Sequence, residues 1–162
     1  MKYILSLTLL ILAIFSSGCT TSYQKEVYKT NLLRANDYVQ LYSKSCFNLC
    51  NLRSSTWERS IKSGKDFNVE ISKETEELER VGRLASIRNS KTSMERYMKE
   101  ASNPPKGYEK AHDKLVEMYG IYSQIYSLSL NPSGSLVSYN NAINDLQSKL
   151  VKASSEFNVL VP

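Results

Sequence analysis

A seam of apolar residues at alternating spacings of four and three restricts the fold of this chain more than any other feature. Such a spacing places its members on one face of an α-helix and is typical of the core position of a helical bundle. We therefore expect a long amphipathic helix over residues 23–62. The seam, in which Arg53 is the one charged member, consists of Tyr28, Leu32, Ala35, Val39, Tyr42, Cys46, Leu49, Arg53, Trp57 and Ile61.

The same helical period continues to the end of the chain and is interrupted by three turn signals. "SGKD" offers Gly64 as a helix C-cap and Asp66 as an N-cap, so a second helix is expected over residues 67–102. "NPPKG" ends that helix, because its two prolines lack backbone donors. "NPSGS" then separates a tyrosine-rich third helix, striped from Tyr108 to Tyr126, from a fourth striped from Leu136 to Phe157. No stretch shows the alternation of a β-strand.

Four helices joined by short connections predict an all-α fold, an antiparallel up-and-down four-helix bundle with two long and two shorter helices. At 1.5 Å per residue, the first two helices span about 55–60 Å and the last two about 35 Å. One way to accommodate this difference is a break in the first helix at Asn51–Ser55, where Ser55 and Glu58 fit a capping box. The other is a projecting hairpin. Its exposed apolar tip would be a candidate partner surface formed by Trp57, Ile61, Phe67 and Ile71.

The N-terminal residues have the pattern of an export signal. Lys2 precedes the apolar run Tyr3–Phe15, which is shorter than the roughly 20 residues that span a bilayer. "SSGC" follows and resembles the lipobox of bacterial lipoproteins, in which the cysteine is diacylated and the signal is cleaved before it. Here that cysteine is Cys19, and the match departs from the family at Ser16, where leucine is usual. An ordinary secretory signal and an uncleaved anchor helix are the alternatives.

The resemblance to lipoproteins implies a signal peptide over 1–18, a lipidated Cys19 with a short tether over 19–25, and one helical-bundle domain over 26–162. Two or more acyl chains make a stable anchor, so the membrane is an expected partner through the lipid. Thr20 after the cysteine implies the outer membrane, facing the periplasm, in a cell that has one. From "NPPKG" through "NPSGSL" and "SYN", the chain also resembles uncharacterised helical lipoproteins of bacteria, which brings no known activity.

Cys46 and Cys50 admit three interpretations. A structural zinc site needs about four ligands, and these two thiols with a single histidine do not supply them, so no metal is expected. A disulfide is chemically reasonable after export. However, Cβ atoms four residues apart on a helix lie about 5–6 Å apart, whereas a disulfide wants about 3.5–4.5 Å. We favour packing of both thiols in the core, with the disulfide as the second hypothesis.

Nothing in the sequence predicts catalysis or a cofactor. The one histidine, His112, has no nucleophile placed beside it by a known motif. The 21 basic and 16 acidic residues are intermixed without a Lys/Arg run, so no nucleic-acid partner is expected. We therefore expect a lipid-anchored envelope protein that acts by contact with another envelope protein. The alternative is a lipoprotein that binds a small ligand in a cavity between helices lined by Tyr119, Tyr122 and Tyr126.

Overall fold

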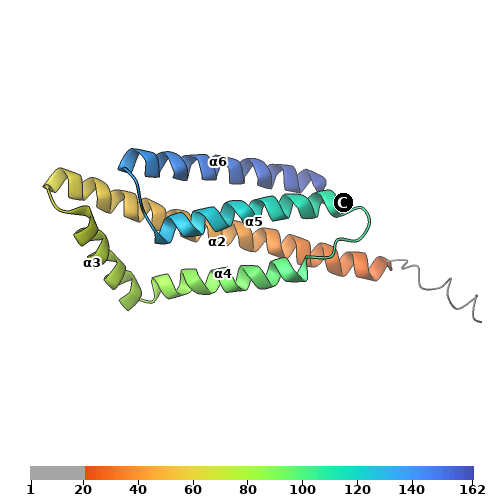
Figure 1. The fold of residues 1–162 in the computed structure, drawn as a ribbon. Helices are drawn as coiled ribbons and strands as arrows, with labels where there is room; N and C mark the ends of the chain where they lie inside the picture. Colours follow the sequence, from red (N-terminus) through yellow and green to blue (C-terminus); the bar gives the residue numbers. More distant parts are fainter. Residues whose placement is uncertain (1–20) are drawn as a thin grey trace, which may run out of the picture.

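The computed structural model describes residues 21–162, and these residues form an elongated bundle of five α-helices without a strand (Figure 1). The all-α prediction is confirmed. The predicted signal peptide and Cys19 lie outside the described residues. None of the helices between residues 21 and 162 combines the length and apolarity needed to cross a bilayer. In chain order the helices are α2 (Ser22–Ser63), α3 (Phe67–Arg80), α4 (Arg83–Glu100), α5 (Glu109–Leu130) and α6 (Leu136–Leu160).

Helix α2 is the central helix of the molecule, because it contacts each of the other four helices and runs along the whole bundle (Figure 1). It begins at Ser22 with a capping box between Thr21 and Gln24, so the helix starts inside the segment 19–25 that we expected to be a tether. The break considered at Asn51–Ser55 does not form. Instead, the Ser55 hydroxyl donates to the Asn51 carbonyl oxygen at 2.9 Å, as a residue inside a continuous helix does.

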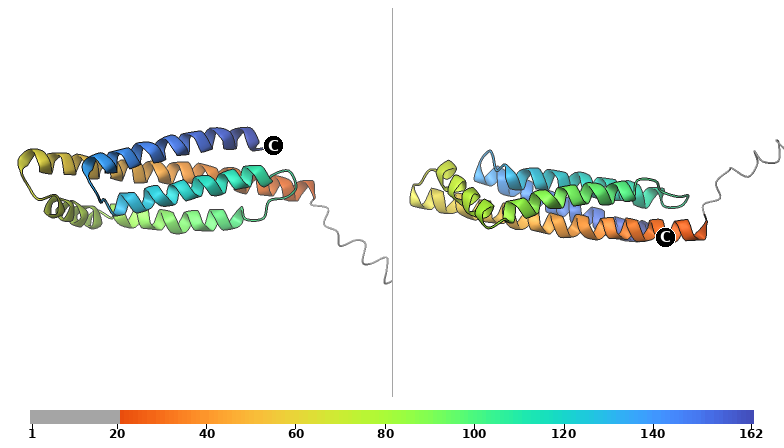
Figure 2. Two further views of the ribbon diagram at one scale, coloured as in Figure 1. Left: turned by 45° about the horizontal axis from the view of Figure 1, so that its top comes forward. Right: turned by 90° about the horizontal axis from the view of Figure 1, so that it is seen from below.

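The predicted second helix over 67–102 is wrong as a single element, and with it the count of four helices. The chain divides into α3 and α4 at Val81 and Gly82, where Gly82 adopts a left-handed φ of 73°. Only glycine adopts this conformation readily, because it has no Cβ. The bend inclines α3 toward the projecting end of α2, while α4 continues along the middle of α2 (Figure 2).

We predict opposite effects for two glycine substitutions that test this bend. Gly82→Ala places a Cβ at a positive φ and is expected to lower the free energy of unfolding by about 1–2 kcal/mol. Gly120→Ala, at an open position inside α5, is expected to raise it by about 0.5–1 kcal/mol. Urea denaturation followed by circular dichroism measures both. If the two variants shift stability in the same direction, Gly82 is not a required bend.

The turn signals read from the sequence work as predicted at two of the connections. Gly64 ends α2 in the left-handed region, with φ of 65°, and the Asp66 carboxylate caps α3 by accepting from the Val69 amide at 3.1 Å. Ser135 caps α6 by accepting from the Ser138 amide at 3.1 Å. These local hydrogen bonds satisfy amides that a helix start otherwise leaves unpaired.

The seam of α2 is the centre of the core. Its members are buried except Tyr42, which is partly exposed, and Ile61, which is exposed. Helices α4 and α6 lie on either side of the α2–α5 pair and do not contact each other within the described residues (Figure 2). A main core extends along the bundle, and a smaller cluster near the far end of α2 contains Cys50, Trp57, Tyr139 and Ile143.

Candidate functional site

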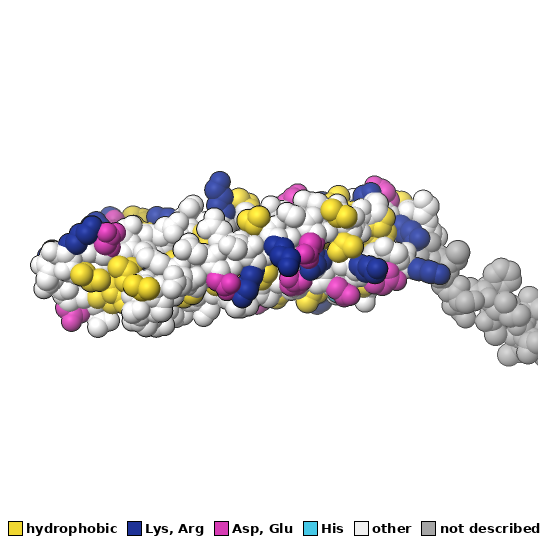
Figure 3. Space-filling model, turned by 90° about the horizontal axis from the view of Figure 1, so that it is seen from above, with side chains coloured by type: hydrophobic (Ala, Val, Ile, Leu, Met, Phe, Trp, Pro, Cys, Tyr) yellow, Lys and Arg dark blue, Asp and Glu magenta, His cyan; other side chains and the backbone are white. Residues whose placement is uncertain are grey.

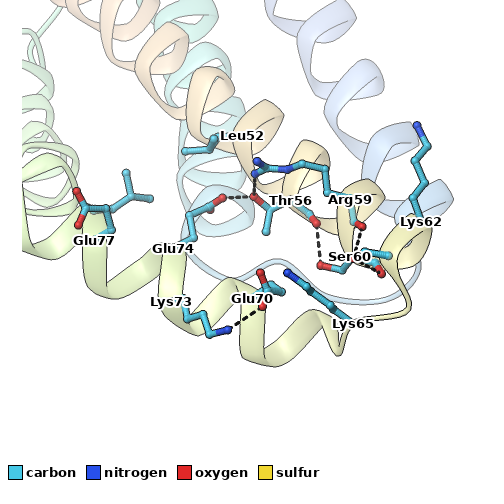
Figure 4. A pocket seen from close by; sticks show the side chains of 12 residues that line it. Leu52, Thr56, Arg59, Ser60, Lys62, Lys65, Glu70, Lys73, Glu74 and Glu77 are labelled. Atoms are coloured by element: carbon cyan, nitrogen blue, oxygen red, sulfur yellow. Dashed lines mark hydrogen bonds and ion pairs between the residues drawn. The ribbon is translucent and has the colours of Figure 1, made fainter.

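A groove lies between the last turns of α2 and helix α3, at the end of the molecule where α2 extends past α5 and α6 (Figures 1 and 4). Its volume is about 760 Å³, which is within the range of ligand sites. Both walls carry charged side chains, and the lining also contains two leucines, Leu52 and Leu78, which we call its apolar base. The charged lining residues are Arg59, Lys62, Lys65, Glu70, Lys73, Glu74 and Glu77.

A buried ion pair beneath the groove joins its two walls. Arg53 on α2 is 1% exposed, and its Nη1 donates to Oε1 of Glu74 on α3 at 2.8 Å. The same nitrogen is 3.4 Å from the Ile71 carbonyl oxygen, and the Thr56 hydroxyl donates to the second oxygen of Glu74. Sequence analysis missed this pair, although an arginine in an otherwise apolar seam is the signal that could have indicated a buried partner.

The lining of the groove contains more cations than carboxylates. Lys62 pairs with Glu58 at 2.6 Å, and Lys73 pairs with Glu70 at 2.9 Å. The hydrogen bond from Lys73, with the charges of Lys65 and Arg59 adding to it, holds the pKa of Glu70 below its ordinary value. Within residues 21–162, neither Arg59 nor Lys65 forms an ion pair of its own. The two cations are therefore available to a ligand.

Three of the four residues of the predicted apolar tip are buried or half-buried in the structure. Trp57 is 9% exposed, because α3 folds over it and stacks Phe67 on its ring at a centroid distance of 3.8 Å. Phe67 and Ile71 are half-buried, and Ile61 is the one exposed member of the four. The bend at Gly82 is the reason, since it lets α3 cover the projecting part of α2. The surface at this end carries a charged groove instead of an apolar tip.

Cys46 and Cys50 are free thiols, both fully buried, as expected from core packing. Cys46 belongs to the main core and Cys50 to the smaller cluster beside Trp57. Burial raises the pKa of Cys46 to about 12 and that of Cys50 to about 11. Neither thiol is a nucleophile near neutral pH, because the thiolate is the reactive form.

We predict that these thiols are masked in the folded protein and make its stability fall in alkali. In a Cys19→Ser variant, a disulfide reagent should react slowly with the native chain at about pH 8 and promptly with two thiols after denaturation. Below the ordinary thiol pKa of 9.0 both states keep their protons. From there to about 11 the unfolded chain loses protons that the folded chain keeps, so the free energy of unfolding falls as pH rises.

The alkaline effect is measured as the urea midpoint against pH, with the same variant carrying Cys46→Ala and Cys50→Ala as the control. The control should show a shallower decline, because its remaining alkaline titration comes from other groups such as Tyr28, whose pKa burial raises to about 12. Two thiols that react at once in the native protein, or none after denaturation, would contradict the buried free pair.

The tyrosines of α5 pack as core and boundary residues. Tyr122 is fully buried, with its hydroxyl 3.4 Å from the hydroxyl of Ser90, and the rings of Tyr119 and Tyr126 flank it at 6.1 and 6.2 Å.

His112 is partly buried, and its Nδ1 lies 3.8 Å from an oxygen of Asp113. In residues 21–162, no three His, Cys, Asp or Glu side chains are grouped to hold a metal ion.

Comparison of the chain with protein-family models, with curated proteins and with solved structures finds no match. The chemistry of the groove therefore rests on its own residues. On the face seen in Figure 3, basic and acidic side chains are intermixed along the bundle. The groove is the place where two cations without an ion pair, Arg59 and Lys65, line one hollow together with Leu52 and Leu78. It is the strongest candidate site in the described part of the chain.

Proposed function

We propose that this protein is a lipid-anchored component of the cell envelope that acts by binding another protein at the α2–α3 groove. The lipid is attached at Cys19, and in a cell with two membranes the domain faces the periplasm from the outer membrane. We propose no catalytic activity for this protein. The topology that we propose is an up-and-down bundle of four antiparallel segments. Helices α3 and α4 together form one of these segments, which is bent.

The observation that carries the proposal is the position of the groove relative to the start of α2. Cys19 precedes the first residue of α2 by three positions, and the groove lies at the other end of this helix, 42 residues long (Figure 1). At 1.5 Å per residue, α2 separates the two ends by about 60 Å. A protein anchored at Cys19 thus presents its groove to a partner at a distance from its own membrane.

The packing of the helices also supports a contact function. The side chains that fill the bundle are apolar along nearly its whole length, and the tyrosines that a ligand cavity would need are packed against the core. A few charged groups beside apolar residues are typical of a binding site. No comparable observation favours a small-ligand cavity between the helices.

Photo-crosslinking in native membranes tests the proposal. A photoreactive residue at Lys62, on the groove, is expected to give a discrete crosslinked product, and one at Lys110, on α5 at the other end, is not. In the Cys19→Ser variant the protein should move to the soluble fraction after export and lose the product. A variant that stays in the membrane fraction, or equal crosslinking from both positions, would refute the proposal.

A further inference from the structure

Two hydrogen bonds fix the side chain of Arg59 in the groove. Its Nη2 donates to the Thr56 hydroxyl oxygen at 2.8 Å (Figure 4). Its Nε donates to the Ser55 carbonyl oxygen at 3.3 Å. Thr56 is fixed in turn by its hydrogen bond to Glu74, which Arg53 holds from beneath. A guanidinium has five N–H donors, so most of the donors of Arg59 stay free while its charge lacks an internal partner. Orientation set before binding reduces the entropy lost on binding.

The rest of the groove selects among anions. Glu70, Glu74 and Glu77 also line it, and their negative charge disfavours a dense polyanion such as a nucleic acid. Ion pairs already balance these carboxylates, through Lys73, Arg53 and Arg80 respectively. The net attraction comes from Arg59 and Lys65, on either side of Gly64. One or two carboxylates match this charge, and the apolar base adds a place for an aliphatic side chain.

We propose that the groove binds an acidic segment of the partner protein, with a Glu or Asp carboxylate between Arg59 and Lys65 and a neighbouring aliphatic side chain against Leu52 and Leu78. A carboxylate accepts two parallel N–H bonds from a guanidinium, which gives the contact direction as well as charge. The inference rests on the proposed function in that the ligand is a protein segment. It does not depend on the lipid anchor.

The test uses a defined peptide in place of the unidentified partner. The exported full-length protein with Cys19→Ser is titrated with N-acetyl-Leu-Glu-Leu-amide and, as the uncharged control, N-acetyl-Leu-Gln-Leu-amide, while amide shifts are followed by NMR. The glutamate peptide is expected to shift amides of the groove, and the glutamine peptide to bind about tenfold more weakly. Inorganic phosphate is the third probe and should compete only weakly.

Matched variants make the result decisive. Arg59→Gln is expected to weaken the glutamate peptide about tenfold or more, because a hydrogen bond to a charged group is lost. Lys65→Gln should weaken it less. Arg34→Gln, an exposed arginine on α2 outside the groove, should have no effect. Absence of groove shifts, equal binding of both peptides, an unchanged Arg59→Gln variant, or tighter binding of phosphate than of peptide would each overturn the inference.

The outcome separates this inference from the proposed function. If Lys62 crosslinks a protein in membranes and Arg59→Gln does not reduce the product, the protein contact stands and the carboxylate contact is wrong. If the peptide binds with the expected selectivity and no product forms in membranes, the groove chemistry stands and the envelope function is wrong.

Discussion

Arg53→Ala is expected to lower the free energy of unfolding by about 3 kcal/mol or more, the largest effect of any charged residue in the described chain. Arg53 is 1% exposed and forms an ion pair with Glu74, which is 13% exposed. Removing the arginine leaves the carboxylate in a site with little water to replace the lost charge. It also leaves a cavity beside α3. Urea denaturation followed by far-ultraviolet circular dichroism gives the free energy of unfolding.

The control for Arg53 is an ion pair of similar length on the surface. Arg88 and Glu79 approach to 2.7 Å with both side chains nearly half exposed, so Arg88→Ala should change stability by no more than about 1 kcal/mol. The double variant Arg53→Met with Glu74→Leu should recover most of the loss, because the pair is replaced by apolar groups. If Arg53→Ala and Arg88→Ala have equal effects, the pair beneath the groove is not a structural element.

Trp57→Ala is expected to lower the free energy of unfolding by about 3–5 kcal/mol and to release α3 preferentially. Trp57 is buried against Phe67, and its ring is also 5.9 Å from that of Tyr139 on α6. Helix α3 has one fully buried apolar residue, Leu78, so much of its attachment depends on the stacked pair. Loss of the indole therefore removes contacts between three helices at once.

Hydrogen exchange measured by mass spectrometry distinguishes local release from general destabilisation. In Trp57→Ala, amides of α3 should exchange faster relative to those of α5 than in the unaltered protein. Phe67→Ala should reproduce this pattern with a smaller loss of stability, and Val159→Ala, at a residue 85% exposed, should change neither quantity. Uniform acceleration across all helices would show that Trp57 supports the bundle as a whole and not α3 in particular.

These variants also bear on the groove, because Arg53 and Trp57 fix the same helix from two directions. The ion pair with Glu74 holds the middle of α3, and the stack with Phe67 holds its first turn. If α3 moves away, the wall that carries Glu70 and Lys73 moves with it. If a variant at Arg53 or Trp57 binds the glutamate peptide more weakly, the loss shows that α3 must be held in position. If Arg59→Gln binds it more weakly with unchanged stability, the loss shows that Arg59 contacts the peptide directly.

The sequence by itself determined the features that are local along the chain. The spacing of apolar residues set the helices and the buried face of α2, since a period of 3.6 places them on one side. Gly64, Asp66 and Ser135 set helix ends, because the hydrogen bonds of a helix cap join residues no more than about four positions apart. The proposed anchor at Cys19 also rests on sequence alone.

Only the tertiary structure decided the bend at Gly82, the burial of Trp57 and the pairing of Arg53 with Glu74. A glycine inside a helical pattern is compatible with a continuous helix, and the contact of α3 with the end of α2 selects the bent form. The ion pair joins residues 21 positions apart, and the stacked rings come from two helices. Such contacts depend on how whole helices pack. A periodic pattern predicts which face of a helix is buried, but it does not predict which other helix packs against that face.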